Sequence, residues 1–321
     1  MARGTRKVGG VVWLRRCIQT LCLLLFIYLF LQTAYHPVNQ TGGPVTLFFE
    51  LDPLVLVATW LAGNPVPLAL LLSLGTLFVS MFLGRWFCGW ICPFGTLHQV
   101  MTQLRGGSTA SRLKRARYSR RQRWKYLILI GLLAGTLTGL NLIGWFDPFS
   151  LLYRSLVTAV FPAFNSGTHA LFAWLYENDP GLGGVKITKV SEPTYEVLRN
   201  NLLVEGRPQY YFGILIGFIF CGILALNLWR HRFWCRYVCP LGALLGLIGK
   251  NPVLRLKKDD AACNNCRICV AVCPGGSNPD GPSEQSEAWK PAECFFCWNC
   301  RAACPKQAIS FEFAVPSREH S

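Results

Sequence analysis

The chain has 321 residues, of which 52% are hydrophobic and only 15% are charged, and its mean hydropathy is +0.32. Soluble domains carry charge on about a quarter of their residues, so the composition argues against an ordinary soluble protein and indicates a membrane protein. The formal net charge of +16 is compatible with nucleic-acid binding. The basic residues flank apolar segments instead of covering a polar face, however, so we expect no nucleic-acid partner.

Four segments are long and apolar enough to cross a bilayer, which takes about 20 residues. We predict spans at about 11–34, 65–84, 126–144 and 210–229, and the last three contain no Asp, Glu, Lys or Arg. A fifth segment, 154–176, includes charged and polar residues and a proline, and we interpret it as interfacial or re-entrant. The first apolar run lacks a small-residue cleavage site, so it is not expected to be a signal peptide.

The basic residues predict the orientation of these spans. Of the 32 Lys and Arg, 27 lie at 3–16, around the start of span one, at 85–125, between spans two and three, or at 230–318, after span four. Cytoplasmic segments carry the excess of positive charge. Both termini are therefore predicted to face the cytoplasm of a bacterial inner (cytoplasmic) membrane, and an insertion at about 145–209 is predicted to lie outside it.

Two halves of the chain resemble each other. The first reads "FFELDPLVLV" (48–57), then span two, then "RWFCGWICPFG"; the second reads "GWFDPFSLL" (144–152), then span four, then "RFWCRYVCPLG". Internal repeats of this kind suggest pseudo-twofold packing. Such packing predicts that four cysteines meet: Cys88, Cys92, Cys235 and Cys239. Duplicated scaffolding is the alternative.

Each half ends in a C-x3-C-P element. Cysteines at i and i+4 share a helix face, while Pro93 and Pro240 suit the first turn of a new helix. Each element is thus predicted at a bend, followed by a helix along the cytoplasmic surface. Neighbouring Arg85, Arg232 and Arg236 are expected to lower the thiol pKa values. Three roles remain open: a further metal or cluster site, a redox-active thiol pair, or packing around a quinone pocket.

Residues 251–321 contain two runs with the C-x2-C-x2-C-x3-C-P spacing of bacterial ferredoxins, in which the fourth cysteine of each run ligates the other cluster. This spacing predicts two [4Fe-4S] clusters and argues against zinc sites. The first ligand set is Cys263, Cys266, Cys269 and Cys304, and the second is Cys294, Cys297, Cys300 and Cys273. The linker between the runs is expected at the surface, and "AISFEF" is expected to be a strand. No C-x-x-C-H is present, which argues against covalent c-type haem.

Other residues carry weaker signals. Asp52 and Asp147 are expected at the outer surface, where they cap helices or hydrogen-bond a quinol head or a partner. Cys17, Cys22 and Cys221 lie within spans and are interpreted as small apolar residues. No catalytic residue is predicted.

The motifs "FCGWICPFG" and "WCRYVCPLG", the four spans and the paired cluster runs resemble the membrane polyferredoxins. This group includes the NapH-type quinol dehydrogenase membrane component of periplasmic nitrate reductase systems, the NosR type and the CcoG type. The layout is closest to the NapH type, because neither a large extracytoplasmic flavin-binding domain nor a C-terminal β-sandwich is present. The insertion at 163–209 departs from a compact NapH-like protein.

The expected fold is therefore an α-helical integral membrane domain (1–250) with four spans in a pseudo-twofold repeat, followed by a cytoplasmic α+β two-cluster ferredoxin domain (251–321). The resemblance implies electron transfer between membrane quinol and a respiratory redox partner. Implied partners are lipid, quinone, other membrane subunits and an extracytoplasmic cytochrome or iron–sulfur protein. The alternative is a membrane protein that binds or reduces copper during metalloenzyme assembly.

Overall fold

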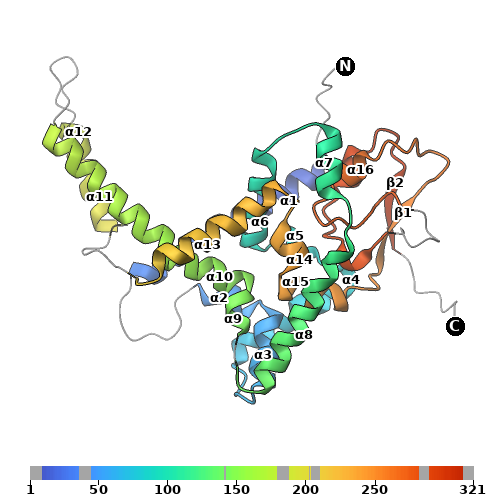
Figure 1. The fold of residues 1–321 in the computed structure, drawn as a ribbon, viewed down its shortest axis with the longest axis horizontal. Coiled ribbons are helices and arrows are strands. Elements are labelled where there is room, and N and C mark those ends of the chain that lie inside the picture. Colours follow the sequence, from blue (N-terminus) through green and yellow to red (C-terminus); the bar gives the residue numbers. More distant parts are fainter. Residues whose placement is uncertain are drawn as a thin grey trace.

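The computed structural model describes residues 9–35, 45–140, 142–178, 188–201, 203, 210–281 and 289–313. Within these residues the fold is mostly helical, with one pair of antiparallel strands, β1 (Leu254–Lys258) and β2 (Ile309–Phe313). The strand pair lies towards one end of the long axis, and the helical insertion lies at the other (Figure 1). In chain order the helices and helical turns are α1 (Gly10–Tyr35), α2 (Thr46–Glu50), α3 (Pro53–Leu61), η1 (Leu68–Leu71), α4 (Leu72–Leu83), α5 (Trp86–Trp90), α6 (Pro93–Leu104), α7 (Thr109–Ala116), η2 (Arg120–Arg123), α8 (Trp124–Leu137), α9 (Ile143–Phe146), α10 (Pro148–Ser155), η3 (Leu156–Val160), α11 (Phe161–Asn178), α12 (Thr188–Asn201), α13 (Gly213–Ala225), η4 (Leu226–Leu228), α14 (Phe233–Tyr237), α15 (Pro240–Ile248), α16 (Ile268–Ala271), η5 (Pro291–Glu293) and α17 (Asn299–Ala303).

Each predicted span contains a helix, but the helices differ in length. Among the described residues, one helix is long and apolar enough to cross a membrane by itself, at Gly10–Thr33 within α1. The apolar runs Leu68–Leu83 and Gly213–Leu228 are shorter, and α8 has 14 residues before Gly139 adopts a left-handed φ of 85°. The four-span arrangement therefore stays a prediction.

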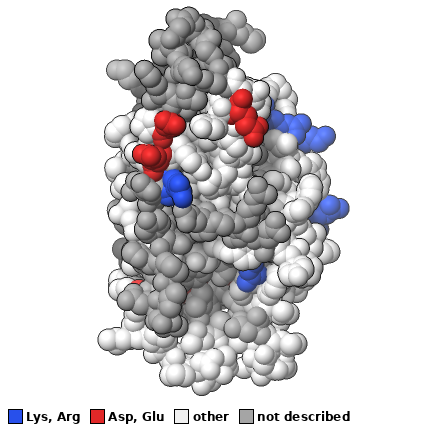
Figure 2. Space-filling model, turned by 90° about the vertical axis from the view of Figure 1, so that its left-hand side faces the viewer, with Lys and Arg blue, Asp and Glu red and all other residues white. Residues whose placement is uncertain are grey.

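The outer faces of these four helices are apolar. Seen from the α11–α12 end, the described surface carries few charged side chains (Figure 2). The large exposed hydrophobic side chains include Leu21, Leu24 and Tyr28 on α1, Leu72, Phe78 and Met81 on α4, Leu127, Ile130 and Leu137 on α8, and Ile214, Leu215 and Phe218 on α13.

The segment 154–176 is not re-entrant. It belongs to one uninterrupted helical run from α10 through the π-helix η3 to α11, so the chain does not turn back within it. The wide turn of η3 precedes Pro162, whose missing N–H removes a helical hydrogen bond. The run packs through η3 against α13.

The two Asp-Pro elements are helix caps, as predicted, but they are not at the surface. Leu54 N donates to Asp52 Oδ1 at 2.7 Å, and Ser150 N donates to Asp147 Oδ2 at 2.8 Å. Both carboxyl groups are fully buried. Burial raises the pKa of Asp52 well above its ordinary value, the neighbouring Asp147 raises it further, and burial also raises the pKa of Asp147. The predicted surface position is wrong, because both side chains are 0% exposed.

The largest hydrophobic core joins parts of the chain that are far apart in sequence. Phe26, Phe87 and Phe149 belong to it, together with Phe295 and Cys297 from the tail. Helix α15 also lies in this core instead of along a surface, because Leu241, Ala243 and Leu245 are fully buried. The boundary predicted at residue 250 therefore separates two segments that share one core.

The tail contains the expected strand. β2 pairs antiparallel with β1, with Leu256 opposite Phe311. The linker prediction was wrong at both ends of the linker, because Ser277 is 2% exposed and Glu293 is 5% exposed. Residues 282–288 of the linker lie outside the described residues.

Candidate functional site

The four cysteines of the first predicted ligand set line one small pocket. Cys263, Cys266 and Cys269 come from one run, and Cys304 comes from the other. Lys258 and Asp280 line the same pocket, and burial raises the pKa of Cys269 to about 12. Four soft sulfur donors around one pocket are the donor set that an iron–sulfur cluster requires.

The second predicted set is more deeply placed. Cys294, Cys297, Cys300 and Cys273 are each at most 8% exposed, and their thiols act electrostatically on one another. The N–H groups of Phe296 and Ser277 point at the Cys294 and Cys273 sulfur atoms, at 3.5 and 3.4 Å. Backbone donors of this kind tune the potential of sulfur-ligated metal centres.

The two runs fold alike. Asn265 and Phe296, at the same position of each run, have φ of 52° and 45°, and Arg267 and Trp298 both have φ of 54°. Left-handed backbone is costly for such residues, so its recurrence at matched positions indicates two equivalent ligand loops. A short helix follows each loop, and these helices, α16 and α17, pack together. The Cys269 thiol also interacts electrostatically with the Cys300 thiol, so the two ligand sets lie near each other.

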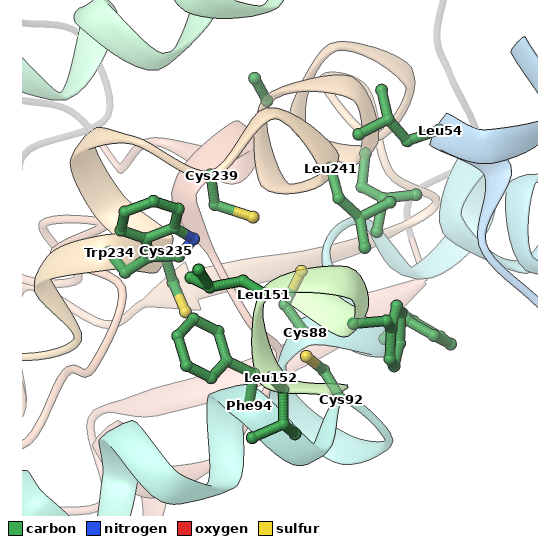
Figure 3. Packing of buried hydrophobic residues seen from close by; sticks show 14 of the residues in the cluster. Leu54, Cys88, Cys92, Phe94, Leu151, Leu152, Trp234, Cys235, Cys239 and Leu241 are labelled. Carbon is green, nitrogen blue, oxygen red and sulfur yellow. The ribbon is translucent and has the colours of Figure 1, made fainter. Parts of the chain in front are cut away.

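The four cysteines of the C-x3-C-P elements lie together in the core (Figure 3). They are 3–5% exposed and are surrounded by apolar side chains that include Phe94, Trp234, Leu151 and Leu152. We call Cys88, Cys92, Cys235 and Cys239 the four-thiol centre. Cys92 and Cys239 cap the new helices, as the prolines predict: Gly95 N and Gly242 N donate to their sulfur atoms at 3.4 and 3.3 Å.

The expected lowering of the thiol pKa values is wrong. Burial raises the pKa of Cys235 to about 11 and raises those of Cys92 and Cys239 well above the ordinary thiol value. Desolvation outweighs the nearby arginines. Without a metal these thiols stay protonated at neutral pH, and thiol–disulfide chemistry needs the thiolate.

Two arginines cross between the halves of the centre. Arg232 Nη1 donates to the carbonyl oxygen of Cys88, and Arg85 Nη2 donates to that of Cys235, both at 2.8 Å. Each arginine precedes its own cysteine by three residues, so this offset was a signal available in the sequence. The guanidinium groups hold the two elements in register.

The tail closes over this centre. The Phe295 ring lies 4.9 Å from Arg85 Cζ and 5.0 Å from Arg232 Cζ, and is 1% exposed. A Cβ on Gly89 would lie 2.6 Å from the Phe295 carbonyl oxygen, and Trp90 Nε1 donates to Phe296 O at 2.9 Å. The segment that carries Cys294 and Cys297 therefore packs against the two C-x3-C-P elements, and Cys297 shares one hydrophobic core with the four-thiol centre.

A buried ion cluster supports the contact. Glu293, beside Cys294 in the chain, pairs with Arg85 at 2.9 Å and with Lys125. Tyr126 Oη also donates to Glu293, at 3.4 Å. Sequence reasoning missed Glu293, Lys125 and Phe295, because nothing in their local spacing marks partners so distant in the chain.

Compact single-metal geometry is absent from the described residues. No three Cys, His, Asp or Glu side chains within them lie close enough together to hold one metal ion. A mononuclear zinc site places each thiolate sulfur about 2.3 Å from the metal, whereas a cubane spreads its four thiolates over separate corners.

Comparison with known families matches both regions. A family model described as a 4Fe-4S binding domain matches residues 65–109 and 212–259, which include both C-x3-C-P elements. A second model, described as a 4Fe-4S dicluster domain, matches residues 255–305.

Curated relatives match most of the chain. The ferredoxin-type protein NapH of Haemophilus influenzae is 26% identical, over 85% of this chain and 79% of the relative. NapH of Escherichia coli is 24% identical, over 91% and 87%. The methylamine utilization ferredoxin-type protein MauN of Paracoccus denitrificans is 25% identical, over 81% and 75%. No solved structure matches the chain.

Proposed function

Because the chain belongs to the membrane polyferredoxin family of the NapH-like proteins, we propose that it carries electrons between the membrane quinol pool and a respiratory redox partner. Iron–sulfur electron transfer is common ground with these relatives. The quinol, the direction of flow and the partner belong to the proposal.

The two ligand sets of the tail would each hold one [4Fe-4S] cluster, which supplies one-electron transfer when bound. Cys263, Cys266, Cys269 and Cys304 would hold the first, and Cys294, Cys297, Cys300 and Cys273 the second. Pro274 and Pro305 end the runs, and the left-handed residues keep each loop tight around its thiols. The N–H donors at Phe296 and Ser277 would stabilise the more negative, reduced state of the second set.

One observation carries the proposal: the second ligand set is in contact with the four-thiol centre through Phe295. The ring touches the arginines that hold Cys88 and Cys235 in place, and its neighbours in the chain are Cys294 and Phe296. The arrangement gives a continuous packed path from the core of the membrane domain to the tail. It excludes water, which lowers the reorganisation needed when charge moves.

For the four-thiol centre we propose a further iron–sulfur site, the first of the three roles suggested by sequence. Burial disfavours free thiolates and thus a thiol pair, and metal ligation is what deprotonates buried thiols. The Gly95 and Gly242 N–H groups are placed to stabilise sulfur-borne negative charge. The match of a 4Fe-4S family model to both elements supports the same role.

Membrane insertion as four spans, with the tail in the cytoplasm, is part of this proposal. Its support is the apolar outer face of α1, α4, α8 and α13 and the concentration of Lys and Arg at one side of the predicted spans. Quinol would then reach the protein from the lipid. The partner would be an extracytoplasmic cytochrome or iron–sulfur protein, together with other membrane subunits.

The decisive test is a cofactor analysis of the purified protein. About eight iron atoms per chain correspond to two cubanes, and about twelve to three. Electron paramagnetic resonance of the reduced protein should show interacting clusters, and quinol should reduce them in reconstituted membranes. Iron near four per chain, or no reduction by quinol, would contradict the proposal.

Serine variants separate the centres. Cys88→Ser and Cys235→Ser should lower iron by about four atoms per chain, and stop quinol-linked reduction of the tail. Cys221→Ser is the matched control, because Cys221 is exposed on α13 and should change neither. If Cys88→Ser keeps both iron and electron flow, the four-thiol centre is scaffold only.

A further inference from the structure

A positively charged cavity lies where the tail meets the membrane domain. Its volume is about 390 Å³, and its polar wall includes Arg16, Arg112, Arg115 and His231. It is distinct from the ligand sets and the four-thiol centre, because no cysteine lines it.

Among the described residues, the cations of this cavity have no counter-charge. No Asp or Glu lines it, and none of the ion pairs given for the described residues includes Arg16, Arg112 or Arg115. Arg115 instead lies near Arg105 and Arg112. Burial is the main cause that lowers the pKa of Arg115, and these two arginines lower it further. Like charges held together repel, so this arrangement is stabilised when an anion enters.

Arg115 is a prepared donor. It is 6% exposed, and its position is fixed by Nη2 donating to Gly106 O at 2.7 Å and Nε donating to Ser111 O at 3.4 Å. Its Nη1 is buried and has no hydrogen-bond partner in the part of the chain that the structure describes. A buried donor without a partner is unfavourable, so a ligand acceptor that reaches Nη1 stabilises this arrangement.

We propose that this cavity binds a phosphate-bearing anion. Guanidinium groups match phosphate oxygen atoms with paired hydrogen bonds, and three arginines line this cavity. His231 adds a neutral ring, because burial and the neighbouring arginines hold its pKa at about 4. The volume admits more than a bare anion, which points to a phosphate attached to a larger body.

The position of the cavity allows two sources of that phosphate. Val12 and Arg16 place it at the end of the predicted first span, within reach of a lipid headgroup. Val272 and Pro274, on either side of Cys273, and Asn299 place it against both ligand loops, within reach of a soluble phosphate compound. The phosphate chemistry is shared, and the experiment separates the sources.

The test has two parts, both with the full, cluster-loaded chain. In the first, the chain in phosphatidylcholine nanodiscs is titrated with inorganic pyrophosphate. In the second, the chain is purified in detergent from mixed phosphatidylcholine–phosphatidylglycerol membranes, and native mass spectrometry measures the lipid that it retains. Arg16→Gln and Arg112→Gln remove exposed charges at the cavity, and Arg115→Gln removes the buried donor. Arg121→Gln removes an equally exposed charge from η2, outside the cavity.

Pyrophosphate binding that weakens about tenfold in Arg112→Gln and is unchanged in Arg121→Gln supports a soluble phosphate ligand. Retained phosphatidylglycerol that is lost in the same variant supports a lipid ligand. Equal behaviour of Arg112→Gln and Arg121→Gln, or binding of neither probe, overturns the proposal. If Arg115→Gln does not fold, Arg16→Gln and Arg112→Gln still test the proposal. Both assays measure binding and need no electron transfer, so failure of the proposed function would be a separate result.

Discussion

Arg85 and Arg232 each form a hydrogen bond with the opposite half of the chain. Each follows one predicted span, yet each donates at 2.8 Å to the carbonyl oxygen of the first cysteine in the opposite half. Both guanidinium groups flank the same ring, Phe295. The two halves and the tail therefore meet at the Phe295 ring, and several predictions test this contact.

Removing the carboxylate of the buried ion cluster should be severe. Glu293→Gln removes the only carboxylate that pairs with Arg85 and Lys125 among the described residues, and breaking a buried pair of this kind costs about 3–5 kcal/mol. The thermal midpoint in detergent, followed by circular dichroism, should fall strongly. Glu312→Gln breaks the exposed pair with Lys257 and should cost less than about 1 kcal/mol. Equal midpoints for the two variants would show that the cluster does not support the fold.

Small changes at a crowded glycine should displace an arginine. A Cβ at Gly242 would lie 2.4 Å from Arg85 Nη2, so Gly242→Ala should loosen the contact with Cys235 and lower both stability and iron content. Gly131→Ala places its methyl group in open space on α8 and should be neutral or stabilising by about 1 kcal/mol. Iron analysis and thermal midpoints of both variants check this. A fully loaded, wild-type-like Gly242→Ala protein would contradict the described packing.

The Asp52–Asp147 pair predicts a pH dependence. Both folded-state pKa values are raised, so the protonated carboxyl favours the fold. This stability is fully present below the unfolded pKa of about 4 and is lost as pH rises through the raised folded pKa. The thermal midpoint should therefore fall over that range.

Asp52→Asn supplies a neutral side chain that still accepts from Leu54 N, and should flatten this dependence. Asp52→Ala should lose the cap as well, at about 0.5–2 kcal/mol. Asp260→Asn, at an exposed aspartate, serves as the control and should leave the pH profile unchanged. An identical profile for Asp52→Asn and wild type would remove the pair as its cause.

Loss of the Phe295 ring should release the tail from the rest of the protein. Phe295→Ala removes a side chain that is 1% exposed, at a cost of about 3–5 kcal/mol, and should expose residues 289–313 to protease. Phe313→Ala alters a ring that is 78% exposed and should leave cleavage rates as in wild type. Protection of the tail in Phe295→Ala would show that other contacts dock it.

The sequence predicted well what depends on local spacing. The x2-x2-x3 runs predicted loops that gather thiols, and the prolines after Cys92 and Cys239 predicted new helices at those residues. The resemblance to the NapH-like polyferredoxins was likewise confirmed. Local spacing also placed Asp52 and Asp147 as helix caps, since an N-cap depends only on the next few residues.

Long-range contacts were beyond such reasoning. Glu293 meets Lys125 across 168 positions and Arg85 across 208, and no periodicity encodes such a pair. The thiol pKa values were predicted in the wrong direction for the same reason. Nearby arginines are visible in sequence, whereas burial depends on which distant segments pack over the thiols.

Closure of the four-thiol centre also implies an order of biogenesis. A ribosome delivers Cys88, Cys92, Cys235 and Cys239 before residues 293–297, which later cover them. Until those residues arrive, the centre stays open on the side that Phe295 will seal. If the centre holds the proposed cluster, that cluster would have to be loaded before the tail docks.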